Sequence, residues 1–180
     1  TSIQVGKCFS LRMFNCENNQ FTGLSLKNNT KLYSVLCYNN PLAVLTLGDL
    51  SNLSYIICEN ARLSSLDVTG CPNLVSLACQ NNQLYSLDLS HNPKLDFLEC
   101  SENRLAALNV SHNLLLNLIN CYGNPFVTDD VEVMKFAQSL PDKNGEYNSG
   151  QVTLNSQHAK DVIEDVCAAK NWKVWVYDPE

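Results

Sequence analysis

The stretch LVSLACQNNQLYSLDLSHNPK, at positions 74–94, is one copy of a unit that recurs every 21 residues along this 180-residue chain. Each copy begins with a leucine, and these leucines are Leu11, Leu32, Leu53, Leu74, Leu95 and Leu116. The spacing holds without insertion or deletion from residue 11 to residue 126, giving five full repeats and a partial sixth. A fixed period of this length is typical of a solenoid, in which each unit packs mainly against its neighbours.

Each unit contains two short segments, LxxLxC and then LxxLxL or LxxLxV. Alternation with a period of two indicates extended chain with one buried face, although the pattern leaves open whether the second segment pairs as a strand. Asn recurs between the two segments, where it can satisfy backbone groups at the turn, so we expect a structural role. The Asn positions are Asn19, Asn40, Asn82, Asn103 and Asn124, with Ala61 as the exception; a second, interrupted series is Asn29, Asn92 and Asn113.

Six of the nine cysteines occupy one inward position of successive repeats, namely Cys16, Cys37, Cys58, Cys79, Cys100 and Cys121. A free cysteine packs as a small hydrophobic residue. Side chains stacked in register point the same way and not at each other, which disfavours disulfides. We therefore expect a ladder of buried free thiols, and no metal site there, because no His or carboxylate shares the position.

The composition argues against a nucleic-acid partner, and the distribution of apolar residues argues against a membrane span. The formal charge of −6 and the pI near 5.0 argue against a nucleic-acid-binding domain. No apolar run approaches the roughly 20 residues of a membrane-spanning helix.

The two ends of the chain depart from the full repeat. Ile3, Val5 and Cys8 match the later positions Leu66, Val68 and Cys71, so the chain opens in mid-repeat and we expect the natural protein to extend further N-terminally. After residue 126 we predict a helix capped by Thr128 and ended by Pro141, a loop over 142–150, a strand over 151–154, a helix capped by Ser156 and a strand over 172–177. The predicted domains are a solenoid over 1–126 and a helix–strand–helix–strand cap over 127–180 that continues the sheet, with an independent binding domain as the alternative.

The repeat resembles the leucine-rich repeats of bacterial surface proteins, in particular internalin-like and BspA-like repeats of the Bacteroidetes type. The matching residues are Leu77-Ala78-Cys79, Asn82, Leu84, Leu87-Asp88-Leu89-Ser90, Asn92-Pro93 and Leu95. The resemblance implies an α/β fold, a right-handed solenoid with a parallel sheet on its concave face. It also implies an extracellular or bacterial cell-surface location and a role such as adhesion to a host protein or glycan.

No arrangement of residues predicts catalysis or a cofactor. His91 and His112 share one position of successive repeats, but no third metal ligand is in register. Asp67 and Asp88 also stack, as an acid–base or Ca²⁺ pair would, yet we expect them to be structural residues on the back of the coil, where Leu-Asp or Leu-Asn recurs. The sequence therefore predicts a protein that is not an enzyme.

The outward positions of the LxxLxC segment carry large apolar and aromatic residues, whereas those of the second segment are small and polar. An exposed apolar patch usually marks a binding surface, although large residues also simply prefer strands. We predict a recognition module for a protein or glycan, or alternatively a spacer that presents another domain; the sequence does not fix the oligomeric state. The predicted partner-binding residues are Glu17, Leu36, Tyr38, Tyr55, Ile57, Glu59, Phe97, Glu99, Leu118 and Tyr122.

Overall fold

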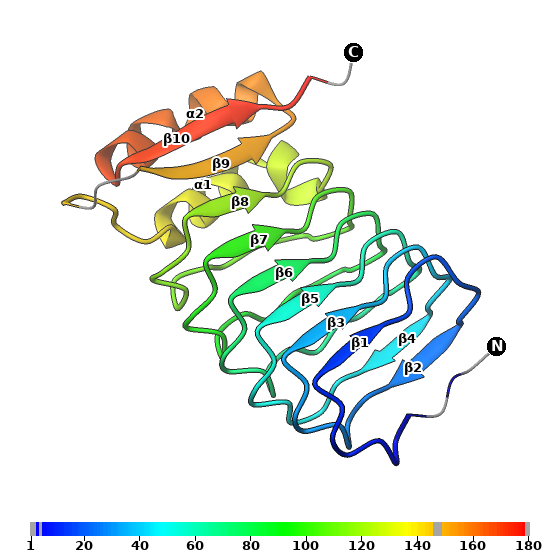
Figure 1. Ribbon diagram of the computed structural model, residues 1–180. Helices are drawn as coiled ribbons and strands as arrows, with labels where there is room; N and C mark the ends of the chain where they lie inside the picture. Colours follow the sequence, from blue (N-terminus) through cyan, green and yellow to red (C-terminus); the bar gives the residue numbers. More distant parts are fainter. Residues whose placement is uncertain (1–2, 4, 146–148, 179–180) are drawn as a thin grey trace.

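The structure, a computed structural model, describes residues 3, 5–145 and 149–178. The chain winds into a stack of coils that is closed at its C-terminal end by two helices and two strands (Figure 1). One side of the stack is an eight-stranded sheet in the order β1-β3-β5-β6-β7-β8-β9-β10. Its strands are β1 (Met13–Asn15), β3 (Ser34–Leu36), β5 (Tyr55–Ile57), β6 (Ser76–Ala78), β7 (Phe97–Glu99), β8 (Leu118–Asn120), β9 (Gly150–Leu154) and β10 (Trp172–Val176).

Every neighbouring pair in this sheet is parallel, and the repeat length sets its register. Met13 lies beside Ser34, Ser34 beside Tyr55, and Tyr55 beside Ser76, each 21 residues further along the chain. The central residue of each coil strand points inward and is buried, as Leu77 does in β6. The fold is therefore the α/β leucine-rich-repeat solenoid that the sequence predicts.

Among the described residues, the second segment of the repeat forms strands in the first two full coils and not in the later ones. In the first two coils, β2 (Gly23–Ser25) and β4 (Val44–Thr46) pair in parallel. In later coils Asp67 and Asp88 occupy the position of Ser25 and Thr46. Asp67 Oδ1 accepts a hydrogen bond from the backbone N–H of Thr69 at 3.0 Å, and Asp88 Oδ1 accepts one from Ser90 at 2.9 Å. Such local turns compete with strand pairing, which accounts for the irregular chain in those coils.

The interior of the stack is a continuous apolar core with the cysteine ladder along one side. All six ladder cysteines are buried and free, as predicted. Burial raises the pKa of Cys58, Cys79 and Cys100 well above the ordinary value of 9.0, and the neighbouring ladder thiols add to the effect. These residues are therefore neutral thiols at physiological pH, which makes them packing groups and poor nucleophiles.

Buried asparagines connect most neighbouring coils, as the sequence predicts, and the series is interrupted at Ala61. Asn82 Nδ2 donates to the carbonyl oxygens of Cys58 at 2.9 Å and Cys79 at 3.1 Å, while its Oδ1 accepts from Leu63 N at 3.0 Å. Asn40, Asn103 and Asn124 make the same bonds. In the second series, Asn92 Nδ2 joins the carbonyl oxygens of Val68 and Cys71.

A further column of residues has left-handed backbone, which the repeat pattern alone does not reveal. Its members, at the turn immediately after the strands, are Asn18, Asn39, Asn60, Asn81, Glu102 and Gly123, with φ between 51° and 68°. Asn and Gly tolerate this conformation better than other residues do. The repeated Asn-Asn pairs of the sequence therefore serve two purposes, a turn at the first Asn and a bridge at the second.

At the N-terminal end the predicted half-repeat lies against the first full coil. Val5 is buried and Ile3 packs on the core, whereas Cys8 is exposed. Asn29 Nδ2 donates to the carbonyl oxygens of Val5 and Cys8, both at 3.0 Å, in the way that Asn92 does three repeats later.

The elements after the last coil are η1 (Pro125–Thr128), α1 (Asp130–Ser139), β9, α2 (Gln157–Ala169) and β10. The prediction that Thr128 caps the first helix is wrong. Thr128 Oγ1 instead closes the 3₁₀ turn on the carbonyl oxygen of Pro125, and Asp129 caps α1 by accepting from the backbone N–H groups of Val131 and Glu132. Ser156 caps α2 as predicted. Of the predicted loop over 142–150, residues 146–148 lie outside the described residues.

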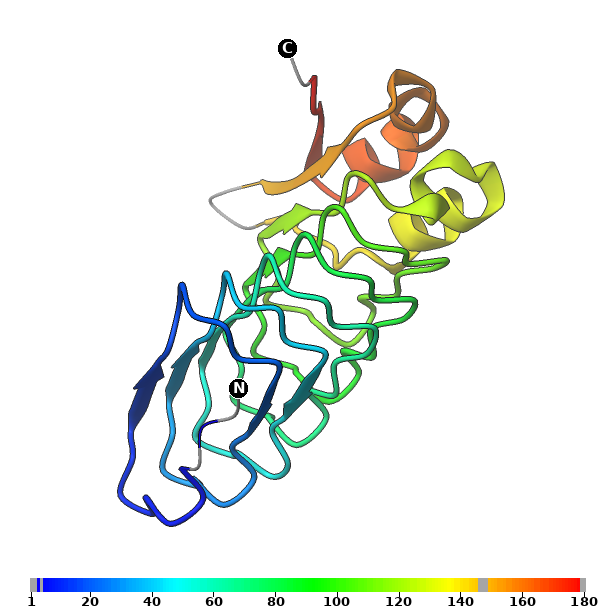
Figure 2. The same ribbon diagram turned by 90° about the vertical axis from the view of Figure 1, so that its right-hand side faces the viewer.

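The two helices cover only the inner side of β9 and β10, as Figure 2 shows from the side. Trp172, at the start of β10, is buried, and its indole N–H donates to the carbonyl oxygen of Pro141 at 2.7 Å. Lys170 Nζ donates to the carbonyl oxygens of Gln138 at 2.7 Å and Leu140 at 2.6 Å, at the end of α1. The outer side of β9 and β10 therefore continues the open face of the coils.

Candidate binding surface on the sheet

The outward side chains of the eight-stranded sheet form one surface, which we call the sheet face. It has three columns, which start at Met13, Asn15 and Glu17 and advance by 21 residues per coil. The register of the last strands carries two of these columns onto the cap. Leu118 is paired with Gln151, which is paired in turn with Lys173, and Asn120 is paired with Thr153, which is paired in turn with Trp175.

All ten predicted partner-binding residues lie on the sheet face and are at least partly exposed. Tyr55 is 48% exposed, whereas Leu36, Tyr38, Ile57, Phe97, Leu118 and Tyr122 are half-buried between their neighbours. The sheet thus brings together side chains that are up to 105 residues apart in the sequence, from Glu17 to Tyr122.

The prediction omitted three large side chains that extend this surface at its two ends. Met13 is 47% exposed in β1, Trp175 is 55% exposed in β10, and Tyr177 follows β10 at 41%. In the predicted strand over 172–177, Trp175 and Tyr177 alternate with Trp172, so they point to the opposite face from the buried Trp172. The sequence does not reveal the parallel register of β10, which aligns Trp175 with one of the three columns of the coils.

An aromatic pair joins the cap to the last coil on this face. The rings of Tyr122 and Tyr177 are stacked with centroids 4.2 Å apart and an interplanar angle of 10°. The backbone N–H of Tyr177 donates to the carbonyl oxygen of Leu154 in β9. The sheet face is therefore continuous across the junction between coils and cap.

Two carboxylates of the sheet face are held by hydrogen bonds from neighbouring side chains. Glu99 accepts from Ser101 Oγ at 2.6 Å and from Asn120 Nδ2 at 2.7 Å, and Glu59 accepts from Gln80 Nε2. Burial, and secondarily the charge of Glu99, raises the pKa of Glu59 above its ordinary value. Both carboxylates are thus fixed in position on a surface that combines apolar and aromatic residues with polar ones such as Asn15, Ser76 and Gln80.

The opposite side of the coils is polar at its turns. Asp67 and Asp88 bond the hydroxyl groups of Thr69 and Ser90 at 2.7 Å, which lowers the pKa of both carboxyl groups. His91 Nδ1 lies 3.0 Å from Ser90 Oγ. Among the described residues, no three His, Cys, Asp or Glu side chains gather as metal ligands.

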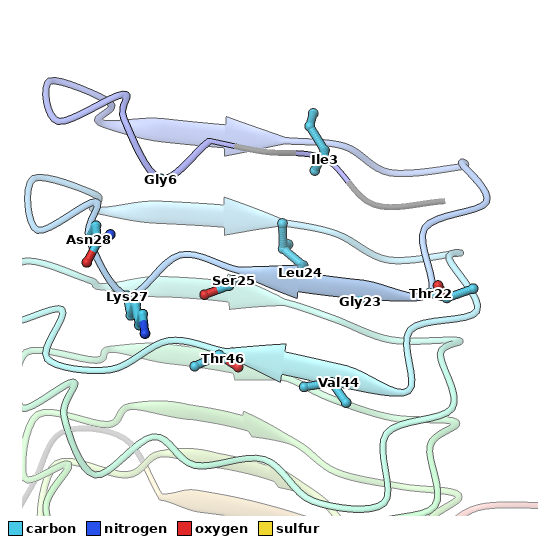
Figure 3. Close-up of a pocket in the computed structure, with 10 residues that line it drawn as sticks. All are labelled: Ile3, Gly6, Thr22, Gly23, Leu24, Ser25, Lys27, Asn28, Val44 and Thr46. Atoms are coloured by element: carbon cyan, nitrogen blue, oxygen red, sulfur yellow. The ribbon is translucent and has the colours of Figure 1, made fainter.

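A shallow hollow of about 450 Å³ lies at the N-terminal end of this side (Figure 3). It is bordered by β2 and β4 through Gly23, Ser25, Val44 and Thr46 and by Ile3 from the first half-coil. Lys27 is the one titratable side chain among its described lining residues. The hollow thus offers no acid–base pair and no nucleophile with a base beside it.

The described helices include none that is long and apolar enough to cross a membrane.

This geometry is that of a leucine-rich-repeat fold, and a solved structure with a TM-score above 0.5 has the same fold. An internalin, InlF, from Listeria monocytogenes has a TM-score of 0.56 at 17% sequence identity, over 97% of this chain and 58% of that chain. The functional domain of InlJ from the same species, described as including a cysteine ladder, has a TM-score of 0.49 at 19% identity, over 100% of this chain and 48% of that one.

A leucine-rich-repeat protein of Leptospira interrogans has a TM-score of 0.45 at 16% identity, over 94% of this chain and 50% of that one. The chain spans about half the length of these structures. No protein-family profile and no curated protein sequence matches it. The likeness to InlF is one of fold.

Proposed function

We propose that this chain is a non-enzymatic recognition module that binds a protein or glycan partner on the sheet face. The observation that carries the proposal is the contrast between the two sides of the coils. The sheet face gathers Tyr55, Phe97, Tyr122, Trp175 and other large side chains, while the opposite side carries mainly small polar residues. Exposed aromatic residues dominate the binding energy of many interfaces, and contiguous apolar patches of this kind mark interaction sites.

The proposed setting is adhesion or host interaction at a bacterial cell surface. It is supported by the likeness of the repeats to internalin-like proteins, which concerns the fold. We also propose that residues 127–180 act as a cap, because α1, α2 and Trp172 cover the end of the last coil. A chain that ends at residue 126 would then expose this core and aggregate, whereas soluble and stable coils without residues 127–180 would argue against the cap.

The binding proposal is tested by presenting the intact chain to a protein library and to a glycan array. The double variant Tyr55→Ala/Phe97→Ala should weaken binding of any partner found at least about tenfold, as expected for two aromatic anchors. The matched control is Tyr85→Ala, which removes a tyrosine that is 57% exposed outside the sheet face. Affinity that responds to Tyr85→Ala and not to the double variant would place the site elsewhere, and no partner at all would favour the spacer.

A further inference from the structure

We propose that the sheet face binds a cationic polypeptide segment, with a Lys or Arg side chain seated on Tyr38 between Glu17 and Glu59. This inference rests on the proposed function, because it takes the sheet face as the binding surface and specifies the chemistry of the partner.

The three residues follow one another in the third column of the sheet face. The backbone N–H of Asn18 donates to the carbonyl oxygen of Tyr38, and that of Asn39 donates to the carbonyl oxygen of Glu59, both at 3.1 Å. Neighbouring strands are about 4.8 Å apart, so the side chain of Tyr38 is flanked in this column by the side chains of Glu17 and Glu59. An aromatic ring flanked by carboxylates suits a cation, which gains both ring and charge-assisted contacts.

These carboxylates are not neutralised within the part of the chain that the structure describes. The ion pairs described there are Lys135–Glu132 and His158–Asp130, and both lie in the cap helices. The outward residues of β3, β5, β6, β7 and β8 include no Lys, Arg or His. A basic partner would therefore meet uncompensated negative charge across the middle of the sheet face.

The partial burial of the Glu17 and Glu59 carboxylates also favours a cationic partner. Glu17 Oε2 is shielded from solvent and has no hydrogen-bond partner among the described residues. Glu59 accepts a hydrogen bond from Gln80 Nε2, but burial, followed by the charge of Glu99, still raises the pKa of its carboxyl group. A partly desolvated carboxylate without a cation is unfavourable, and an incoming ammonium or guanidinium group would offset that penalty.

The neighbouring column favours a polypeptide over a sugar. Leu36, Ile57 and Ala78 lie side by side next to Tyr38, Glu59 and Gln80. Their side chains offer no hydrogen bonds, so sugar hydroxyl groups placed there would lose water without compensation. The apolar stems and neighbours of Lys and Arg residues in a peptide can cover such a strip.

The test uses the intact chain and two labelled synthetic peptides, an arginine–serine repeat and its glutamate–serine counterpart, with binding followed by fluorescence anisotropy. The arginine peptide should bind at least about tenfold more tightly than the glutamate peptide, with an affinity that falls as salt is added. Glu17→Gln/Glu59→Gln should weaken it by about tenfold. Asp67→Asn/Asp88→Asn, which removes two charges from the opposite side, should change it less than about twofold. Thermal unfolding of each variant verifies that it is folded.

The variant Tyr55→Ala/Phe97→Ala, measured with the same peptides and with neutral oligosaccharides, separates this inference from the proposed function. One outcome is that a peptide or a sugar binds, that Tyr55→Ala/Phe97→Ala weakens this binding and that Glu17→Gln/Glu59→Gln does not. That outcome would overturn the inference of a cationic partner and leave the sheet face as the binding site. Equal affinity for the two peptides would also overturn it. If binding responds to neither pair of residues, the sheet face is not the binding surface and both proposals fail.

Discussion

Inward and outward residues of the same strands differ in how much they vary from coil to coil. The inward positions repeat almost unchanged. Cys58, Cys79 and Cys100, for example, each fill the same space in their coil and pack against equivalent core residues. The outward positions beside them change freely, from Tyr55 to Ser76 to Phe97 in adjacent strands. Repetition thus follows the constraints of stacking, whereas the outward positions of the same strands are free to vary.

The largest expected effect is alkaline unfolding caused by the interior thiols. Because burial raises the pKa of Cys37, Cys58, Cys79, Cys100 and Cys121 in the folded chain, the folded state holds protons that the unfolded state releases above about pH 9. The contribution of these thiols to the free energy of unfolding is therefore fully present below pH 9. Above pH 9 it falls by about 1.4 kcal/mol per thiol per pH unit. Five thiols would remove about 7 kcal/mol by pH 10, comparable with the stability of a whole domain.

Urea unfolding at several pH values measures this slope. Cys58→Ala should reduce the slope by one proton, whereas Val35→Ala, another core truncation, should lower stability without changing the slope. An equal slope in both variants would contradict the role of the ladder.

The next effect concerns the buried asparagines. Asn82→Ala leaves Leu63 N and the carbonyl oxygen of Cys58 without their partner inside the stack, so we expect a loss of about 2–4 kcal/mol. For a chain of this size the melting temperature should fall by roughly 5–10 °C. Asn19→Ala is the control, because Asn19 has the same position in the repeat but is exposed; a drop as large as that of Asn82→Ala would contradict the argument.

A gain of stability is expected from a substitution at Ala61, where the series of buried asparagines is interrupted. Ala61 occupies the position that Asn has in the other coils and cannot accept a hydrogen bond from Leu42 N. The backbone N–H of Leu42 instead donates to the carbonyl oxygen of Asn40 at 2.7 Å. Ala61→Asn should restore the bridge and add about 1 kcal/mol, measured by urea unfolding. Ser65→Asn, a surface change in the same coil, should have no comparable effect.

The smallest expected effect is on the sheet face. Tyr55→Ala removes a half-exposed side chain that the stack does not need, so stability should change by less than about 1 kcal/mol. Calorimetry of this variant, which is also part of the binding test, would show a clear loss only if Tyr55 were a structural residue.

Most of the fold follows from the sequence because the 21-residue period dictates which residues become neighbours. Leu77, Cys79 and Asn82 have their positions from the repeat alone, and so do the ten predicted surface residues. Departures arise where a local bond decides between similar conformations. Asp129 and not Thr128 caps α1, because the 3₁₀ turn after Pro125 already uses the Thr128 hydroxyl group.

The part of the candidate site that the sequence did not reveal lies outside the repeat. Trp175 and Tyr177 join the sheet face through the pairing of β10 with β9 and of β9 with β8. Their spacing from the coils is not a multiple of the repeat, so no periodicity indicates that Tyr177 stacks on Tyr122.

The interruption at Ala61 also has a kinetic consequence. In a linear stack each coil opens and closes against its neighbours, so the contact that lacks a buried asparagine bridge, between the coils that start at Leu32 and Leu53, is where opening should begin or stop. It divides the chain into early coils that carry Glu17 and Tyr38 and later coils that are held by the cap and carry Phe97 and Tyr122. A ligand that spans both groups would act as a clamp across this seam, and amide hydrogen exchange in the early coils should slow when it binds.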